Sequence, residues 1–393
     1  MEEFPTIGKY NKAIKEKGSG VFRSLTNLEI IPSRISPIKV FLFGSGAYAA
    51  VFKGRQDNST YALRCFLNSG EEAADRLEMI TSYLKRINAR WITPCDFMAN
   101  EIQIEGRYYP VLKMEWIDGV LLNDFISKHL SNNQVLTDLQ KQLLEISKSL
   151  EENNIGHGDL QCGNIMVSGI TNNFIIRLID YDGMYTPYLI NQKSLENGRS
   201  EFQHPDRAYG PFNHKIDRFS FWVILTALEA LKYDKTLWRE VMQGGYNTLD
   251  NMLFKAADFK NPHQSPLFAR LYQINQESLN FYLNNLKNLS NGGITNVIPP
   301  ELFATPNGFK IPESHRKFVP NLPPDPGTIT SNFQILANEE AVVLSSTFQK
   351  LGNTPLLLEK AKFNGKTVVV SNGTKTRQVL LSSHKDVIEL TFT

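Results

Sequence analysis

The sequence lacks several features that would each indicate a particular class of protein. No uncharged run approaches the length of a membrane span, and the first residues lack the apolar stretch of a secretory signal. The three cysteines, Cys65, Cys95 and Cys162, are too few and too widely spaced for a disulfide framework or a paired-cysteine zinc site. With 42 basic and 40 acidic residues, the chain has no charge excess to attract nucleic acid or anionic lipid. We therefore expect a protein of a reducing cytoplasm, with no nucleic-acid and no membrane partner.

The length and composition are those of an ordinary globular protein. Of its 393 residues, 41% are hydrophobic and 21% are charged, which supplies enough apolar material for a sizeable core. The length predicts two or three domains. The sequence has no internal repeat, and its strongest compositional bias is a run of prolines after residue 298.

The chain changes character near residue 38. Residues 1–37 mix charges, glycine and proline with a few apolar anchors such as Tyr10 and Phe22, and we interpret them as an N-terminal extension. From Ile38, three short strand-like runs separated by turn residues predict an antiparallel meander. Apolar residues then recur at alternating steps of four and three, which predicts a helix. These residues are Ala73, Leu77, Ile80, Leu84 and Ile87.

Two more strand-like segments follow, and helical spacing dominates after about residue 118. Eight of the 19 prolines lie in 298–327, a density that blocks regular helix and sheet and predicts an extended linker. Beyond the linker, alternating apolar segments broken by Asn and Gly turns predict a small β module over residues 328–393.

Three segments carry residue types that suggest chemistry, and the first is Gly44-Ser45-Gly46. It lies between two predicted strands, where a glycine turn would let backbone N–H groups approach phosphate oxygens. Taken alone, such a segment is more often a simple hairpin turn.

The second segment, HGDLQCGN at residues 157–164, follows a long predicted helix. Its Asp159 and Asn164 could place a carboxylate beside an attacking hydroxyl and an amide oxygen on a metal ion. The third is a strand-like run that ends in Asp180 and Asp182, two acids that could hold Mg²⁺ in a cleft. A polar loop and solvated turn acids are the alternatives, but the order and spacing of all three segments favour phosphoryl transfer.

In this order the segments resemble the protein-kinase-like superfamily over about residues 38–290. GSGAYAAV resembles the glycine-rich loop, YALRCF the strand that normally reads Ala-x-Lys, KMEWIDG the adenine hinge and HGDLQCGN the catalytic loop. LIDYDG stands where Asp-Phe-Gly is expected, FQHPD resembles the end of the activation segment and DRFSFW the start of the central helix. The resemblance implies a bilobal α+β fold over residues 38–297, with a β-rich N-lobe (about 38–117) and a helical C-lobe (about 118–297).

The resemblance also implies roles for single residues, with ATP and Mg²⁺ as cofactors. Asp159 would accept the proton of the acceptor hydroxyl, and Asn164 and Asp180 would ligate Mg²⁺, assisted by Asp182. Asp217 would brace the catalytic loop by accepting backbone N–H bonds, although a helix N-cap role would also explain it. Met114 would lie behind the adenine as the gatekeeper. The residues implied to bind the nucleotide are Gly44, Ser45, Gly46, Val51, Arg64, Met114, Glu115 and Ile117.

Several positions depart from the family pattern. Arg64 and Gln161 stand where lysines are usual, so two compact cations that would contact the phosphates are replaced. Gly158 replaces an arginine that often binds a phosphorylated activation loop. No single acid of the following helix is an obvious partner for Arg64, since Glu78, Asp75 and Glu72 compete.

We therefore expect a phosphotransferase, most simply an atypical Ser/Thr protein kinase, with two alternatives. The replaced lysines are compatible with a pseudokinase scaffold, and HGD and IDYD are also similar to aminoglycoside and choline phosphotransferases. FPTIGKYNKAI and IDYDGMY resemble bacterial kinase-like proteins that are associated with von Willebrand A-type and PP2C-type phosphatase partners.

Overall fold

The computed structural model describes most of the chain, and the described residues fall into two compact units. One unit lies within residues 1–186 and 194–311, and the other within residues 187–193 and 312–393. Most of the predicted linker, residues 303–327, lies outside the described part of the chain. The structure describes residues 4–33, 41–45, 49–67, 71–171, 173–243, 251–302, 332–337, 342–345, 350–353, 356–359, 367–372, 376–380 and 387–390.

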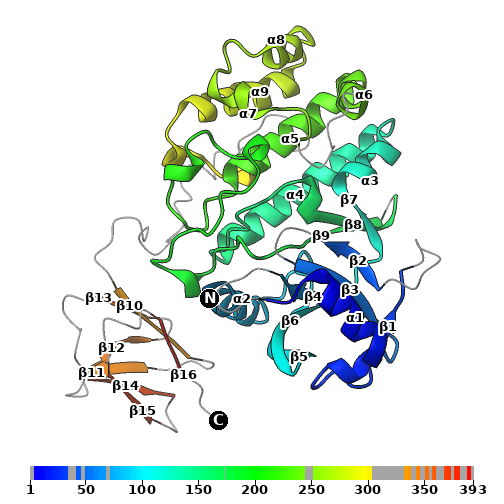
Figure 1. Cartoon of the computed structure of the whole chain (residues 1–393). Helices are drawn as coiled ribbons and strands as arrows, with labels where there is room; N and C mark the ends of the chain where they lie inside the picture. The colour runs from blue at the N-terminus through cyan, green and yellow to red at the C-terminus, as the bar shows by residue number, and fades with distance from the viewer. Residues whose placement is uncertain are drawn as a thin grey trace. The chain divides into compact units, whose positions relative to one another are not determined.

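The first unit contains a six-stranded antiparallel sheet in the order β1-β3-β4-β6-β5, with β2 also paired to β3 (Figure 1). Because β2, β3 and β4 pair in chain order, the predicted meander is confirmed. The strands are β1 (Glu29–Ile31), β2 (Leu42–Ser45), β3 (Ala49–Gln56), β4 (Ser59–Phe66), β5 (Cys95–Ile104) and β6 (Arg107–Glu115).

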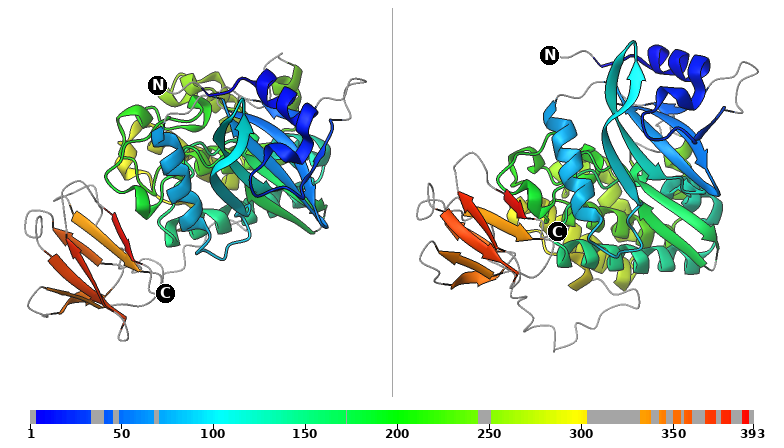
Figure 2. Two further views of the ribbon diagram at one scale, coloured as in Figure 1. Left: turned by 60° about the horizontal axis from the view of Figure 1, so that its bottom comes forward. Right: turned by 90° about the horizontal axis from the view of Figure 1, so that it is seen from below.

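The residues interpreted as an N-terminal extension are built into this sheet. They form α1 (Ile7–Lys17), the short helix η1 (Gly18–Val21) and the edge strand β1. The Thr6 side chain caps α1, and Tyr10 and Ile14 of α1 are buried against residues of β3 to β6. Figure 2 shows α1 lying against the sheet. The apolar anchors of residues 4–31 therefore complete the core of the N-lobe.

The predicted helix after the meander is α2 (Glu71–Leu84), which buries Leu77, Ile80 and Leu84. It ends before Ile87, which lies in the turn that follows.

The C-lobe is built around two adjacent helices, α4 (Asn133–Glu152) and α5 (Arg218–Tyr233) (Figure 1). Asn132 caps α4 by accepting from the amides of its first turn, and α4 buries one apolar face. Nearly every residue of α5 is buried, as expected for a central helix. No helix in the described part of the chain is both long and apolar enough to cross a membrane. The other helices of this unit are α3 (Leu122–His129), α6 (Thr236–Gln243), α7 (Ala256–Lys260), α8 (Pro266–Gln273), α9 (Glu277–Asn291) and the short helices η2 (Cys162–Asn164), η4 (Ser200–Phe202), η5 (Arg207–Tyr209), η6 (Ile294–Asn296) and η7 (Pro300–Leu302).

A small antiparallel sheet of β7 (Gly119–Leu121), β8 (Ile165–Ile170) and β9 (Asn173–Leu178) completes the first unit. The catalytic-loop segment lies between α4 and β8, and the candidate metal-binding acids follow β9. The antiparallel sheet of β1 to β6 and the mainly helical region that follows it confirm the bilobal α+β fold.

The second unit contains the short helix η3 (Pro187–Leu189) and a small β module. Its described strands form two sheets, in the orders β13-β10-β16 and β12-β11-β14-β15, around a core that includes Ile335, Val343 and Val370. The strands are β10 (Asn332–Ala337), β11 (Val342–Ser345), β12 (Lys350–Asn353), β13 (Leu356–Glu359), β14 (Thr367–Ser371), β15 (Thr376–Leu380) and β16 (Val387–Leu390).

Candidate active site

The catalytic-loop segment is held from below by Asp217. This buried carboxylate accepts hydrogen bonds from the backbone N–H of His157 and from that of Gly158 (2.9 Å). It makes no side-chain cap bond to its own helix, so the predicted bracing role is confirmed and the N-cap interpretation is not. Burial raises the pKa of Asp217, and the neighbouring His157 and the two N–H donors oppose that rise.

A second brace joins the loop to the strand end that carries the acids. The imidazole Nε2 of His157 lies 2.9 Å from the carbonyl oxygen of Ile179. Gly158 has φ +84, and a Cβ at this position would collide with the carbonyl oxygen of Gly183. The close approach of these two backbones explains why a glycine stands where the family often has arginine.

Asp159 and Asn164 are brought together, as their spacing predicted. The amide Nδ2 of Asn164 donates to the backbone oxygen of Asp159 (2.8 Å) and to its Oδ2 (2.9 Å). Gln161 donates more weakly to the same Oδ2, at 3.4 Å. Since its nitrogen faces Asp159, the Oδ1 atom of Asn164 has no hydrogen-bond partner in the described residues and is left for another ligand.

Asp180 and Asp182 stand on either side of a fixed aromatic residue. Tyr181 is fully buried, and its hydroxyl accepts from the Thr93 amide (2.8 Å) and donates to the Leu178 carbonyl (2.9 Å). Asp180 has φ +65, a conformation that aspartate tolerates better than most residues. The anchored tyrosine therefore sets where both carboxylates point.

Arg64 on β4 is paired with these two acids. Its Nη1 and Nη2 atoms each lie 2.5 Å from one oxygen of Asp182, and Nη1 is 3.0 Å from Asp180. Burial opposes the charge on Arg64, but the two carboxylates outweigh it and raise the pKa of the guanidinium. Both oxygens of Asp182 are engaged by Arg64, so a metal ion at Asp182 would share these oxygens with the guanidinium.

Of the acids of α2 that were considered as partners of Arg64, Asp75 and Glu78 are not paired with it, and the side chain of Glu72 lies outside the described part of the structure. Asp75 and Glu78 are both exposed, and neither forms an ion pair with Arg64 in the described structure. Helix α2 instead buries Arg76, whose guanidinium lies 5.1 Å from the ring centre of Phe212. The burial of Arg76 was not predicted. Its position four residues before Ile80, on the apolar face of α2, could have indicated it.

Three of the residues that were predicted to bind the nucleotide, Gly44, Val51 and Arg64, lie on neighbouring strands of the sheet. Gly44 pairs with Val51 across the β2–β3 ladder, and Val51 in turn lies opposite Arg64 on β4. Ser45 closes β2, whereas Gly46 lies outside the described residues. The pairing of β3 with β4 thus brings Val51 and Arg64 onto adjacent strands.

The hinge begins at Met114, which is nearly buried at the end of β6. The Glu115 N–H donates to the carbonyl oxygen of Pro94 (2.8 Å), and its side chain pairs with Arg177 (2.6 Å). The backbone of Ile117 makes no hydrogen bond to the described residues. Its N–H and C=O groups are therefore available to an adenine edge.

Two charged residues that were not predicted lie near the site. Burial and the neighbouring Asp159, Asp180 and Asp182 raise the pKa of Glu196 to about 7, while Arg64 opposes this rise. Arg207 is buried, and burial lowers its pKa against the opposing field of nearby acids, of which Asp217 is the strongest.

The donor set fits a magnesium ion held jointly with phosphates. No group of three or more His, Cys, Asp or Glu side chains in the described residues could hold a metal ion unaided. Mg²⁺ usually takes only one or two protein oxygens together with substrate phosphates and water. The unpartnered Oδ1 of Asn164 and the half-exposed carboxylate of Asp180 match that requirement.

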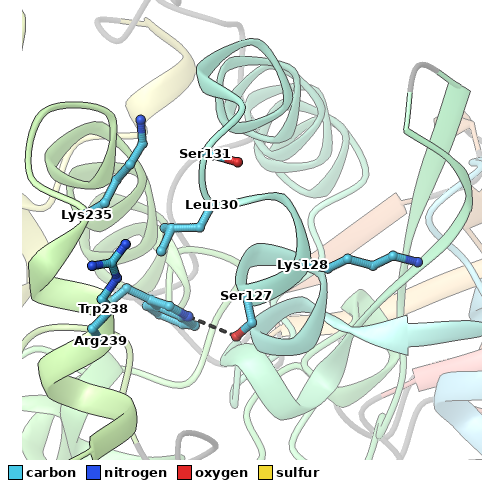
Figure 3. A pocket seen from close by; sticks show the side chains of 7 residues that line it. All are labelled: Ser127, Lys128, Leu130, Ser131, Lys235, Trp238 and Arg239. Atoms are coloured by element: carbon cyan, nitrogen blue, oxygen red, sulfur yellow. Dashed lines mark hydrogen bonds between the residues drawn. The ribbon is translucent and has the colours of Figure 1, made fainter.

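A separate cavity of about 390 Å³ lies elsewhere in the C-lobe, between the end of α3 and α6 (Figure 3). The indole nitrogen of Trp238 donates to Ser127 Oγ (2.9 Å) at its floor. Lys235 and Arg239 come from the α6 side and Lys128 from α3. The cavity is thus distinct from the catalytic-loop segment and the acids after β9.

Comparison with known families supports the resemblance to the protein-kinase-like superfamily. The model of the protein kinase domain matches residues 39–289. No curated protein is significantly similar to the chain.

Proposed function

Because the chain belongs to the protein kinase family, we propose that it transfers the γ-phosphoryl group of ATP to a Ser or Thr hydroxyl of a protein. The observation that carries this proposal is the pairing of Asp159 with Asn164 on a loop braced by Asp217. A base and a metal ligand held at fixed separation are what phosphoryl transfer requires of the protein.

Each residue of the site would have a separate role in the reaction. Asp159 would accept the proton of the attacking hydroxyl, and Met114 and Ile117 would hold the adenine against the hinge. Asn164 and Asp180 would hold Mg²⁺, which when bound neutralises charge on the phosphates. The backbone of Gly44 and Ser45 would cover the phosphates.

The experiment is phosphoryl transfer from labelled ATP, measured in the intact chain, to protein acceptors and to the chain itself. Asp159→Ala and Asp180→Ala are expected to lower transfer at least a hundredfold. Asp138→Ala removes an acid of α4 that pairs with Lys141, and it is the matched control. Equal transfer in all four proteins would refute the assignment.

One observation favours a second function, binding without turnover. Arg64 is paired with Asp182 and Asp180, so a guanidinium already held by two acids stands where the family has a lysine that contacts the phosphates. A pseudokinase would show a higher melting temperature with ATP and Mg²⁺ but no transfer to any acceptor. Thermal-shift titration beside the labelling assay separates the two functions.

We also propose that the β module or the N-terminal segment recruits a protein partner in a bacterial cytoplasm. The sequence resemblance supports von Willebrand A-type and PP2C-type phosphatase proteins as the first candidates. Calorimetric titration of the intact chain with the products of adjacent genes of these two types tests the idea. No heat of binding with either would remove them as candidates.

A further inference from the structure

We propose that Asp182 is a positioning residue for Arg64: it holds the guanidinium beside the nucleotide phosphates, in place of an acid of α2. This inference rests on the proposed phosphotransferase function. In protein kinases the cation of this strand is held by an acid of the following helix, and catalysis needs that ion pair in place. Here both terminal nitrogens of Arg64 lie 2.5 Å from the carboxylate of Asp182. The acid therefore comes from the segment after β9, which also carries Asp180.

Arg64 lies on the face of the sheet that is turned toward the site. Its neighbours on β4, Leu63 and Cys65, are fully buried in the cluster that contains Tyr10 of α1. Because successive side chains of a strand point to opposite faces, Arg64 points away from this cluster. Val51 lies opposite Arg64 on β3 and therefore shares its face. The guanidinium thus projects to the side where the resemblance places the nucleotide.

Helix α2 offers no described acid that takes the place of Asp182. Asp75 and Glu78 are exposed and make no ion pair with Arg64 in the described structure. Among the described side chains of α2, the buried charged one is a cation, Arg76, and a like charge cannot hold Arg64. The acids that contact Arg64 in the described residues therefore belong to the segment after β9.

Asp182 is itself carried by a fixed segment. The preceding residue, Tyr181, is fully buried, and its hydroxyl makes two hydrogen bonds. On the other side of this tyrosine, Asp180 lies 3.0 Å from Arg64. One short anchored segment thus positions both the cation and the proposed magnesium ligand, so their separation does not depend on where α2 lies.

An arginine suits this position better than a lysine would. A guanidinium carries five N–H groups in a planar fork, whereas an ammonium carries three donors on a single nitrogen. Asp182 takes one N–H from each terminal nitrogen of Arg64, so donors remain for a phosphate oxygen. Arg64 is nearly buried, and a cation that water screens so little attracts a phosphate strongly. Arg64 can therefore be held by an acid and still stabilise charge on the transferred group.

The test is a double-mutant cycle in the intact chain, with kcat measured from labelled ATP. Asp182→Asn keeps the shape of the side chain and removes its charge, and Arg64→Met removes the cation. We expect Asp182→Asn to lower kcat by about tenfold to a hundredfold. In the Arg64→Met background the same change should alter kcat by less than about threefold, because Asp182 acts through Arg64. The KM for ATP should change less than kcat in Asp182→Asn, since the removed anion no longer repels the phosphates.

Two sets of controls accompany the cycle. Glu29→Gln removes the charge from another arginine–carboxylate pair, with Arg55 at the edge of the sheet, and should leave kcat unchanged. The α2 variants Glu72→Ala, Asp75→Ala and Glu78→Ala should also retain kcat, since the cation would not depend on this helix. Thermal unfolding shows whether each variant is folded, and its shift with ATP and Mg²⁺ shows whether the variant still binds nucleotide.

The outcomes separate this inference from the function on which it rests. If the wild type transfers phosphoryl groups and Asp182→Asn retains its kcat, the positioning role is refuted and the function stands. Losses that multiply in the double variant would also overturn it, because Asp182 would then act independently of Arg64. A higher kcat in Asp182→Asn, or an equal loss in one of the α2 variants, would likewise overturn it. A wild type that transfers no phosphoryl group to protein or water refutes the proposed function, and the positioning role with it.

Discussion

The Arg64–Asp182 pair allows a quantitative prediction about the stability of the site. Arg64→Met removes the cation at similar length and leaves Asp180 and Asp182 facing each other without it. Asp182→Asn removes one charge, but Arg64 keeps its contact with Asp180 at 3.0 Å. We therefore expect the arginine substitution to cost more than the aspartate substitution.

The magnitude follows from burial. Breaking a fully buried pair costs about 3–5 kcal/mol. Arg64 is only 13% exposed, but Asp182 is 32% and Asp180 is 46% exposed, so water screens part of the interaction. We expect about 2 kcal/mol for Arg64→Met, about 1 kcal/mol for Asp182→Asn and a coupling energy of about 1 kcal/mol in the double variant.

Urea unfolding followed by tryptophan fluorescence is the suitable assay. The four tryptophans, Trp91, Trp116, Trp222 and Trp238, all belong to the first compact unit, so their signal reports that unit alone. Free energies of unfolding of the wild type, both single variants and the double variant form the cycle. Equal costs for the two single variants together with a coupling near zero would show that the pair does not act as described.

Three further predictions concern other contacts. The free energy of unfolding of Glu196→Gln relative to that of the wild type should increase by about 1 kcal/mol from pH 5 to pH 8, as measured by thermal unfolding. The pKa of Glu196 is raised to about 7 in the folded protein, from an ordinary value near 4.5. The protonated side chain therefore contributes its full stabilisation of the fold below pH 4.5, and this stabilisation is lost as the pH rises through 7. Because Glu196 is exposed, water screens its charge and reduces the effect. Glu101→Ala should cost about 2–3 kcal/mol in urea unfolding, because Glu101 accepts from both Ser24 and Leu25 amides; a cost below 0.5 kcal/mol, on the order of an ordinary surface change, would contradict this. Gly158→Ala should abolish transfer and lower the melting temperature by at least about 5 °C, whereas Gly20→Ala should leave both unchanged.

The proximity of Asp159 and Asn164 in the catalytic-loop segment could be predicted because it depends on short-range spacing. Asp159 and Asn164 lie on one tight loop, so their distance is largely set by the sequence itself. The role of Asp217 was predicted through the resemblance, and its two hydrogen bonds agree. Gly158 was noted only as a departure, because its close contact with Gly183 depends on how two distant segments approach.

The partner of Arg64 could not be predicted for the same reason. Its bonds to Asp182 join residues 118 positions apart, and they depend on how the two lobes meet. The hydrogen bond from the Arg199 backbone N–H to Asp159 left no mark in the sequence, since a backbone N–H is common to almost every residue. Residue types indicate which side-chain groups are present, but they do not predict which backbone N–H groups will donate hydrogen bonds to a site.

The placement of the N-terminal segment has a practical consequence for any shortened form of this protein. A fragment trimmed to the family match, residues 39–289, would lose β1 and α1. The outer edge of β3 would then be open to pairing with another molecule, and Phe52 and Leu63 would lose the cover of Tyr10 and Ile14. We expect such a fragment to aggregate for reasons unrelated to catalysis, and a lack of activity in it would say nothing about the intact chain.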